Sequence, residues 1–406
     1  MKFFKIDSLL SSLRRVTSTG TYDPRLDGLR ALAILPVLVW HMSLRGNRMI
    51  AQQAPMTEAQ ITQANLIPHG VSGVMLFFFV SGLIIAFPFL RAAVTDKPRP
   101  SIGSFYLRRL SRLMPAYFIA LTLAFIALQV SGYAPSDAPS FSESSIPLPV
   151  SYVASLLYQH NLLFGTPSRI IPPSWSLEVE IQFYLVAPLL LIGYAKLAPA
   201  LRRSLLVALI SISLVAVNFV LYELSYAAHE YSVLGYLHYF LAGILVSDLT
   251  FGSPVKERRW GDLLFVAGYV VLLAAATIRP DSAESFFARD AGMFVGVLAT
   301  YWGGMSGKFA HRLLSLRPIA VMGGACYSIY LTHLPIIQAY SEVAKRLHTP
   351  DTLLTSWALM LPSIPIAIVG GMVFYALIEH PTMRPDWPRR LRSALFSRKT
   401  PAARAE

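Results

Sequence analysis

Arg30 and His41 are two ionisable residues that bracket an apolar stretch without any other charge. In a helix, the residues between them rise ~16 Å and complete three turns plus about 20°, so both side chains leave the same face. An ionisable side chain in an apolar span faces a bundle interior or an aqueous cavity, because lipid does not solvate it. The spacing therefore predicts a helix face with a fixed cation at one end and, at the other, an imidazole that exchanges protons near neutral pH.

Three arginines, Arg108, Arg109 and Arg112, stand together in FYLRRLSRLMPAY at the start of another apolar run. Guanidinium groups match phosphate oxygens with paired hydrogen bonds, so the cluster could clamp phosphates. Basic residues beside an apolar span also mark its cytoplasmic end, with no ligand involved. Both interpretations stay open.

Two glutamates, Glu178 and Glu180, lie in the segment WSLEVEIQFYL. Positions two apart point to opposite sides of a helix, so only Glu180 shares a face with Ser176 and Tyr184. A carboxylate near a helix N-terminus is also stabilised by the helix dipole, which leaves a capping role open for each glutamate.

His333, in CYSIYLTHLPII, is expected near the same end of the membrane domain as His41. It either hydrogen-bonds a neighbouring helix or takes part in the site. His69, in an outer loop, and His238, at the start of the span near 233–250, are less well placed for chemistry. The chain has no HExxH signature, and spacing does not support metal binding by His41, His333 and Glu180, so we expect no metal.

The composition indicates an integral membrane protein. Hydrophobic residues make up 54% and charged residues 14% of the 406 positions, and the mean hydropathy is +0.52. A soluble domain carries roughly 25% charged residues. The net charge of +13 could suggest nucleic acid, but the basic residues are spread between apolar runs, so we expect no nucleic acid partner. The single cysteine, Cys326, excludes an intramolecular disulfide.

The apolar runs predict an all-α bundle of about ten transmembrane helices in a lipid bilayer. An even number of spans places both termini on one side, and the basic residues make that side cytoplasmic. Only seven basic residues fall in the loops assigned to the other side: Arg45, Arg48, Arg169, Arg279, Arg289, Lys345 and Arg346. The spans are predicted near 28–44, 71–90, 113–131, 175–196, 203–222, 233–250, 262–278, 291–307, 318–339 and 353–378.

The chain divides into one large unit and two short ends. Residues 1–27 form a cytoplasmic arm whose spaced apolar residues suggest a helix lying on the membrane surface. Residues 28–380 form the membrane domain, and 381–406 a short basic cytoplasmic tail. We expect no second catalytic domain in that tail.

The sequence resembles the acyltransferase-3 family of membrane acyltransferases, which modify sugars of surface polysaccharides, glycolipids or antibiotics. The similarity runs along the chain in family order. It departs at Ile181, where the family often has an acidic residue, and at Thr332, where it often has Trp. The motifs that carry it are LDGLR with Arg30 and His41, GVMLFFFVSG, Arg109 and Arg112 followed by Pro-Ala-Tyr, WSLEVEIQFYL, CYSIYLTHLP and FYALIEHP.

The resemblance implies an O-acyltransferase in the bacterial inner membrane, without a bound cofactor. Its co-substrate would be a cytoplasmic acyl-CoA, with acetyl-CoA expected, and its acceptor a carbohydrate hydroxyl on the outer side. In this interpretation His41 is the general base and Glu180 orients its imidazole. An acyl-histidine intermediate stays open. The residues expected to contact substrates are Arg30, Arg109, Arg112, His333, Ser81, Tyr330 and Trp175.

A transporter or flippase is the alternative, with Arg30 and His41 in an ion or substrate pathway. The chain shows no inverted repeat, and transport does not require an arginine cluster at one mouth. The sequence therefore favours the acyltransferase.

Overall fold

The computed structural model describes residues 23–95, 97–132, 146–224, 231–251, 255–383 and 387. Within these ranges all regular structure is helical, which confirms the predicted all-α class. The predicted surface helix of the N-terminal arm and nearly all of the predicted basic tail lie outside the described residues.

Eighteen α-helices and four short 3-10 or π segments follow one another in the described ranges. The α-helices are α2 (Pro24–Ala51), α3 (Glu58–Asn65), α4 (Val71–Val94), α5 (Ile102–Ser131), α7 (Leu148–Leu156), α8 (His160–Phe164), α9 (Trp175–Ala195), α10 (Pro199–Ile212), α11 (Asn218–Leu224), α13 (Leu237–Thr250), α14 (Gly261–Ala275), α15 (Ala283–Ser306), α16 (Lys308–Leu314), α17 (Arg317–Gly324), α18 (Cys326–Leu347), α19 (Leu353–Met360), α20 (Ser363–Phe374) and α21 (His380–Thr382). The 3-10 turns are η1 (Pro172–Ser174) and η3 (Val233–Tyr236), and the π segments are η2 (Ser213–Val217) and η4 (Tyr375–Glu379).

Seven helical segments of the described chain are long and apolar enough to cross a membrane, and the bent pair α17–α18 makes up to eight. The predicted spans near 262–278 and 291–307 do not meet this test. Helix α14 is apolar but only 15 residues long, and α15 carries Glu284, Arg289 and Asp290 in its first third. The count of ten spans and the side of the termini therefore stay predictions.

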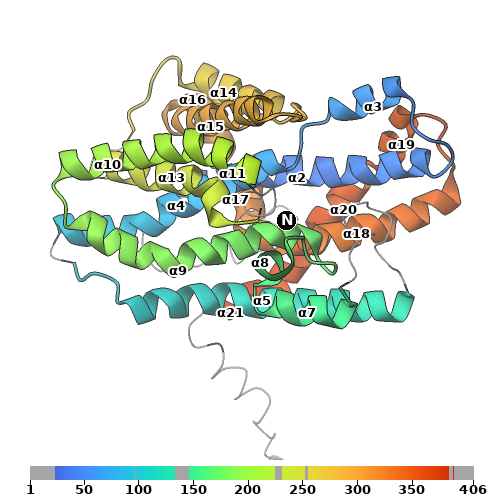
Figure 1. Ribbon diagram of the computed structural model, residues 1–406, viewed down its shortest axis with the longest axis horizontal. Coiled ribbons are helices and arrows are strands. Elements are labelled where there is room, and N and C mark those ends of the chain that lie inside the picture. Colours follow the sequence, from blue (N-terminus) through green and yellow to red (C-terminus); the bar gives the residue numbers. More distant parts are fainter. Residues whose placement is uncertain are drawn as a thin grey trace, which may run out of the picture.

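Helix α4 packs against α2, α13 and α9, and in Figure 1 it lies between α13 and α9. Small residues let these helices approach closely. A Cβ on Gly73 would collide with the carbonyl oxygen of Ala33, and one on Gly82 would collide with that of Phe240. These glycines of GVMLFFFVSG thus allow α4 to pack closely against α2 and α13.

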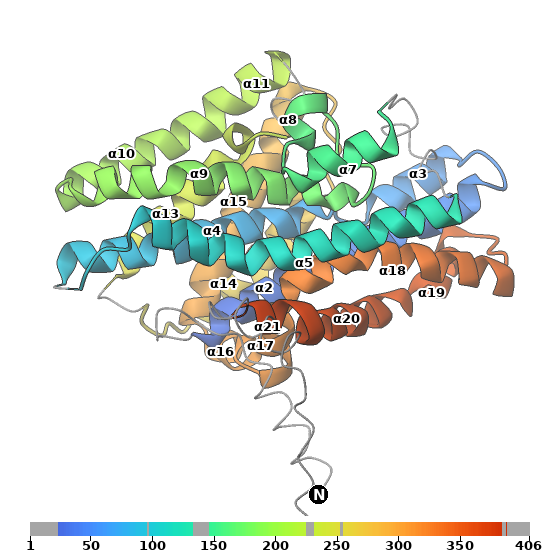
Figure 2. The same cartoon turned by 90° about the horizontal axis from the view of Figure 1, so that it is seen from below.

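Helix α2 starts with Asp23 as its N-cap, whose side chain accepts from the Arg25 amide at 3.0 Å, and continues through Pro36 to Ala51. At its far end, beyond His41, it packs against α19, whereas α17 packs near its start. The chain bends by 74° between α17 and α18. This bend directs α18 alongside α2 and α20, as Figure 2 shows.

Candidate active site

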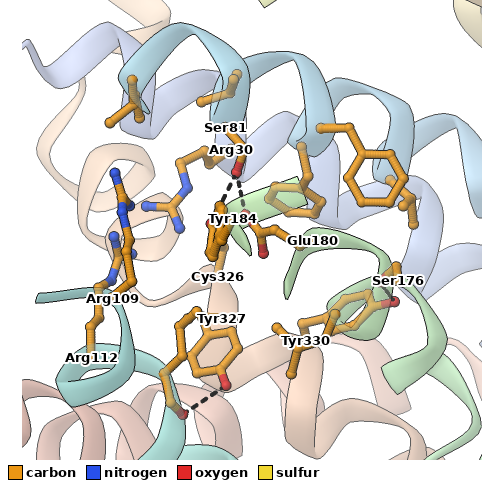
Figure 3. Close-up of a pocket in the computed structure, with 17 residues that line it drawn as sticks. Arg30, Ser81, Arg109, Arg112, Ser176, Glu180, Tyr184, Cys326, Tyr327 and Tyr330 are labelled. Atoms are coloured by element: carbon orange, nitrogen blue, oxygen red, sulfur yellow. Dashed lines mark hydrogen bonds between the residues drawn. The ribbon is translucent and has the colours of Figure 1, made fainter. Parts of the chain in front are cut away.

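A cavity with about 800 Å³ of space, partly open to the outside, lies between α2, α4, α5, α9 and α18 (Figure 3). We call it the arginine cavity. Six of the nine predicted site residues line it, namely Arg30, Ser81, Arg109, Arg112, Glu180 and Tyr330. The other three, His41, His333 and Trp175, lie outside its lining.

One end of the cavity is strongly positive. Arg30 pairs with Asp27 at 3.4 Å, and the guanidinium of Arg109 lies over the ring of Tyr184 at 5.4 Å. Within the described chain, neither Arg109 nor Arg112 forms an ion pair with a carboxylate, and the buried Nε of Arg112 has no hydrogen-bond partner. Two cations without counter-ions thus line a space that an anionic ligand can enter.

The structure separates the third arginine from these two. Arg108 is exposed and does not line the cavity, although it lies one helical turn before Arg112 on α5. The three arginines that the sequence groups together therefore divide into one surface residue and two cavity residues.

Glu180 lies in the middle of the cavity wall, where its carboxylate accepts hydrogen bonds from the hydroxyls of Ser81 and Tyr184. The bond from Ser81 joins α4 to α9, and the bond from Tyr184 lies within α9. Glu180 does not cap α9, which begins at Trp175. Glu178, on the opposite face, is fully buried and accepts from the Asn161 amide at 2.8 Å. Glu178 therefore links α9 to α8 and points away from the cavity, because positions 178 and 180 lie on opposite faces of α9.

His41 and His333 form a direct pair. The Nδ1 of His41 lies 3.2 Å from the Nε2 of His333, and their ring centroids are 4.8 Å apart. His41 Nδ1 also lies 2.9 Å from the carbonyl oxygen of Val37, and His333 Nδ1 lies 2.6 Å from that of Tyr330. A carbonyl oxygen only accepts, so each Nδ1 carries a proton, and the Nε2 of His333 accepts from His41. The Nε2 of neutral His41 consequently keeps a free lone pair.

This pair changes the expected role of Glu180. The hydrogen bonds of Glu180 go to Ser81 and Tyr184, whereas the Nδ1 of His41 faces His333 and Val37. The structure thus does not bring Glu180 and His41 together, and His333 stands where the sequence interpretation put the glutamate. Sequence spacing within single helices could not show this, since the partners come from α2 and α18.

Tyr330 connects the cavity to the histidine pair. Its hydroxyl bonds Ser176 Oγ at 2.7 Å and the carbonyl oxygen of Pro173 at 2.5 Å, which ties α18 to the start of α9. The ring centroids of Tyr330 and His333 are 5.6 Å apart. Tyr330 lines the end of the cavity that lies away from the arginines (Figure 3). Trp175 packs beside this end, with its ring 6.5 Å from that of Phe78.

Several lining residues were not among the predicted site residues. Tyr184 and Ser176 share the helix face of Glu180, and this spacing could have predicted that they line the cavity. Cys326 and Tyr327 reach the cavity only because the chain bends before α18, which no spacing in the sequence indicates. Across the described residues, no group of three or more His, Cys, Asp or Glu side chains could hold a metal ion.

Comparison with known proteins identifies the family. The sequence profile of the acyltransferase-3 family, described as an acyltransferase domain, matches residues 23–376. The O-acetyltransferase OatA of Staphylococcus aureus is 26% identical over 339 residues, which are 78% of this chain and 51% of the relative. The putative peptidoglycan O-acetyltransferase YrhL of Bacillus subtilis is 25% identical over 396 residues, 90% of this chain and 55% of the relative.

A third relative, the peptidoglycan O-acetyltransferase OatA of Listeria monocytogenes, is 26% identical over 79% of this chain and 50% of its own length. The chain thus spans about half the length of these relatives. No solved structure matches it. With a family profile that covers most of the sequence, and with relatives named as O-acetyltransferases, the resemblance is confirmed: the chain belongs to the acyltransferase-3 family.

Proposed function

We propose that this chain transfers an acyl group, with acetyl as the expected one, from acyl-CoA to a hydroxyl of an extracytoplasmic carbohydrate. The observation that carries the proposal is the His41–His333 pair, whose geometry leaves a lone pair on His41 Nε2. A neutral imidazole held in this tautomer is suited to take a proton from a hydroxyl. The names of the relatives, which include peptidoglycan O-acetyltransferases, support a carbohydrate acceptor.

The donor fits the arginine cavity. The phosphates of coenzyme A would bind Arg109 and Arg112, whose guanidinium groups have no carboxylate partner in the described chain, with Arg30 adding a third cation. The pantetheine arm is thin and mostly uncharged, so it can follow the cavity wall past Glu180 towards Tyr330. The thioester would then lie near the histidine pair.

In the proposed reaction, His41 Nε2 takes the proton of the sugar hydroxyl while the oxygen attacks the thioester carbonyl. The carbon–sulfur bond breaks, the new ester forms, and the thiolate of coenzyme A takes the proton back from His41. His333 is a positioning residue, because its Nε2 accepts the His41 Nδ1 proton and favours the imidazolium that forms in between. No metal is needed for any of these steps.

The proposed setting is a multi-pass protein of the bacterial inner membrane, with the arginine end of the cavity cytoplasmic. The apolar helices support the membrane, and the basic residues of the N-terminal arm and alternate loops support the orientation. A transporter has no comparable support, because the relatives are named for acetyl transfer.

The test is acetyl transfer by the purified chain in lipid nanodiscs, with radiolabelled acetyl-CoA and isolated cell-wall glycan. His41→Gln keeps size and polarity but cannot accept the proton, so we expect transfer to fall by about 10²-fold or more. Acetyl-CoA affinity should stay unchanged, and His348→Gln, an exposed histidine on α18's C-cap, is the matched control. More than about a tenth of wild-type transfer in His41→Gln would show that His41 is not the base.

The role of His333 has its own comparison within the same assay. His333→Gln can still accept from His41 Nδ1 through its amide oxygen, whereas His333→Leu cannot. We expect the glutamine variant to retain clearly more transfer than the leucine variant, with equal donor affinity. Equal losses in both variants would contradict a positioning role.

A further inference from the structure

A second cavity, with about 760 Å³ of space partly open to the outside, lies between the start of α4, the start of α15, α11 and η3. We call it the Arg289 cavity. Aromatic rings of Tyr222, Tyr236 and Phe286 form part of its wall, and His69, Arg289 and Asp290 supply polar groups. None of these residues takes part in the donor site described above.

Arg289 is a cation without an anionic partner in the described chain. Its guanidinium lies over the ring of Phe286 at 4.6 Å, and its buried Nε has no hydrogen-bond partner. The neighbouring Asp290 does not neutralise it, because that carboxylate accepts from the Tyr239 hydroxyl at 2.7 Å and from Asn218 Nδ2 at 2.5 Å. The Nε2 of His238 also lies 3.1 Å from Oδ2 of Asp290. The positive charge of Arg289 is thus available to a ligand in the cavity.

His69 adds a hydrogen-bond donor. Its Nδ1 accepts from the Val71 amide at 3.1 Å, so the proton of the neutral ring is on Nε2, which has no hydrogen bond to the described residues. Burial and the charges of Arg289 and Arg279 lower the pKa of His69 to about 3, and the ring therefore stays neutral near pH 7. The His69 ring packs on that of Trp40 with centroids 4.3 Å apart. Trp40 directly precedes His41, so the cavity borders the helix turn that carries the proposed base.

The aromatic wall indicates the chemistry of the ligand. The rings of Tyr222 and Phe286 have centroids 5.4 Å apart, and Tyr236 is on the same lining. Aromatic faces pack against the C–H faces of sugar rings, while nearby N–H donors bind the hydroxyls. An uncharged peptide or lipid chain would leave the guanidinium of Arg289 without a partner, whereas a charged sugar uses both the arginine and the aromatic rings.

We propose that the Arg289 cavity is the acceptor site, and that it takes a sugar unit carrying a carboxylate or a phosphate. The negative group would bind Arg289, the sugar ring would lie on the aromatic wall, and His69 would donate to a ring substituent. The inference rests on the proposed function for the identity of the acceptor as a glycan. It goes beyond that function by assigning the site and the charge of the acceptor.

Direct binding to the full chain in nanodiscs tests this with three probes that all contain N-acetylglucosamine. Chitotetraose is neutral, a hyaluronan tetrasaccharide carries carboxylates, and N-acetylglucosamine 1-phosphate carries a phosphate. We expect at least one anionic probe to bind about tenfold or more tightly than chitotetraose, as loss of a charge-assisted hydrogen bond implies. The anionic probe with the higher affinity shows whether the site prefers a carboxylate or a phosphate.

Variants link the preference to the cavity. Arg289→Gln should abolish the anionic preference, whereas Arg346→Gln, which removes an exposed arginine outside the cavity lining, should preserve it. Tyr222→Leu should weaken all binding probes alike and leave their ratio unchanged. Absence of binding by every probe, equal binding of charged and neutral probes, or an unchanged ratio in Arg289→Gln would each overturn the proposal.

Transfer is measured in parallel to keep the two proposals apart. If the wild-type chain transfers acetyl and Arg289→Gln binds all probes like wild type, the acceptor site is wrong while the proposed function stands. If anionic sugars bind as expected but no acetyl is transferred, the site stands as a glycan site and the proposed function fails.

Discussion

At the scale of single residues, the candidate site depends on which atoms are already bonded. The proposed roles of His41 and His333 depend on two carbonyl oxygens, those of Val37 and Tyr330, which accept hydrogen bonds from the two Nδ1 atoms. The proposed binding role of Arg109 and Arg112 depends on the opposite condition, since neither guanidinium is paired with a carboxylate of the described chain. An arginine that is paired with a carboxylate has a structural role instead. Arg202 and Arg203 are examples, because both form ion pairs with the buried Asp248.

The arginines give a prediction at this scale. Arg112→Ala should weaken acetyl-CoA binding about tenfold to a hundredfold, because a charge-assisted contact to phosphate contributes about 1.5–3 kcal/mol. Arg112→Lys should recover only part of the affinity, since an ammonium cannot form the paired hydrogen bonds of a guanidinium. The measurement is a donor titration by calorimetry.

Arg108→Ala is the matched control, because Arg108 is exposed on the same helix and does not line the cavity. Its donor titration should coincide with that of wild type. If the Arg112→Ala titration also coincides with wild type, the cluster serves only to orient the helix in the membrane.

Sequence periodicity predicts correctly what lies on one helix. Glu180, Ser176 and Tyr184 share a face of α9 as their spacing requires, and all three line the arginine cavity. Periodicity could not predict which helices pack against one another. The partner of His41 lies on α18, and the hydroxyl that binds Glu180 from α4 is Ser81, so both pairings follow from packing rather than from spacing.

At the scale of elements, close helix contact sets the position of Ser81. Helices α4 and α13 touch through glycines on both sides. A Cβ on Gly243 would collide with the Phe79 carbonyl oxygen and lie only 2.6 Å from the Leu83 amide nitrogen. These two backbone atoms flank Ser81 on α4. Any side chain at position 243 must therefore separate the helices or shift the turn that holds Ser81 against Glu180.

Gly243→Ala should therefore destabilise the protein by about 1–3 kcal/mol, the usual range for overpacking a tight core. Thermal unfolding of the purified protein in detergent measures this. Gly193→Ala on α9 is the control, because a Cβ at that position would have nothing within 4 Å and alanine favours a helix. An equal thermal midpoint for both variants would show that the α4–α13 contact can relax at no cost.

At the scale of the whole molecule, the two ends are distinct. The start of α2 and the loop before α14 lie at one end, since Arg25 donates to the Met305 carbonyl oxygen at 3.3 Å and the Arg258 amide to that of Ser306 at 2.9 Å. At the other end, beyond His41, Gln53 donates to the carbonyl oxygen of Pro350 at 2.9 Å. The proposed transfer requires the first end to face the cytoplasm, where acyl-CoA is made, and the second to face the acceptor.

Cysteine labelling tests this orientation, because the one native thiol, Cys326, is buried. Gln52 and Lys256 are exposed residues at opposite ends. A maleimide that cannot cross membranes should label Gln52→Cys in cells whose inner membrane is intact, because that residue would be extracytoplasmic. It should label Lys256→Cys only after the inner membrane is permeabilised, and the wild-type chain in neither condition. The reverse pattern would place the arginines on the outer side, away from any acyl-CoA, and equal labelling of both variants in intact cells would contradict a chain that crosses the membrane between them.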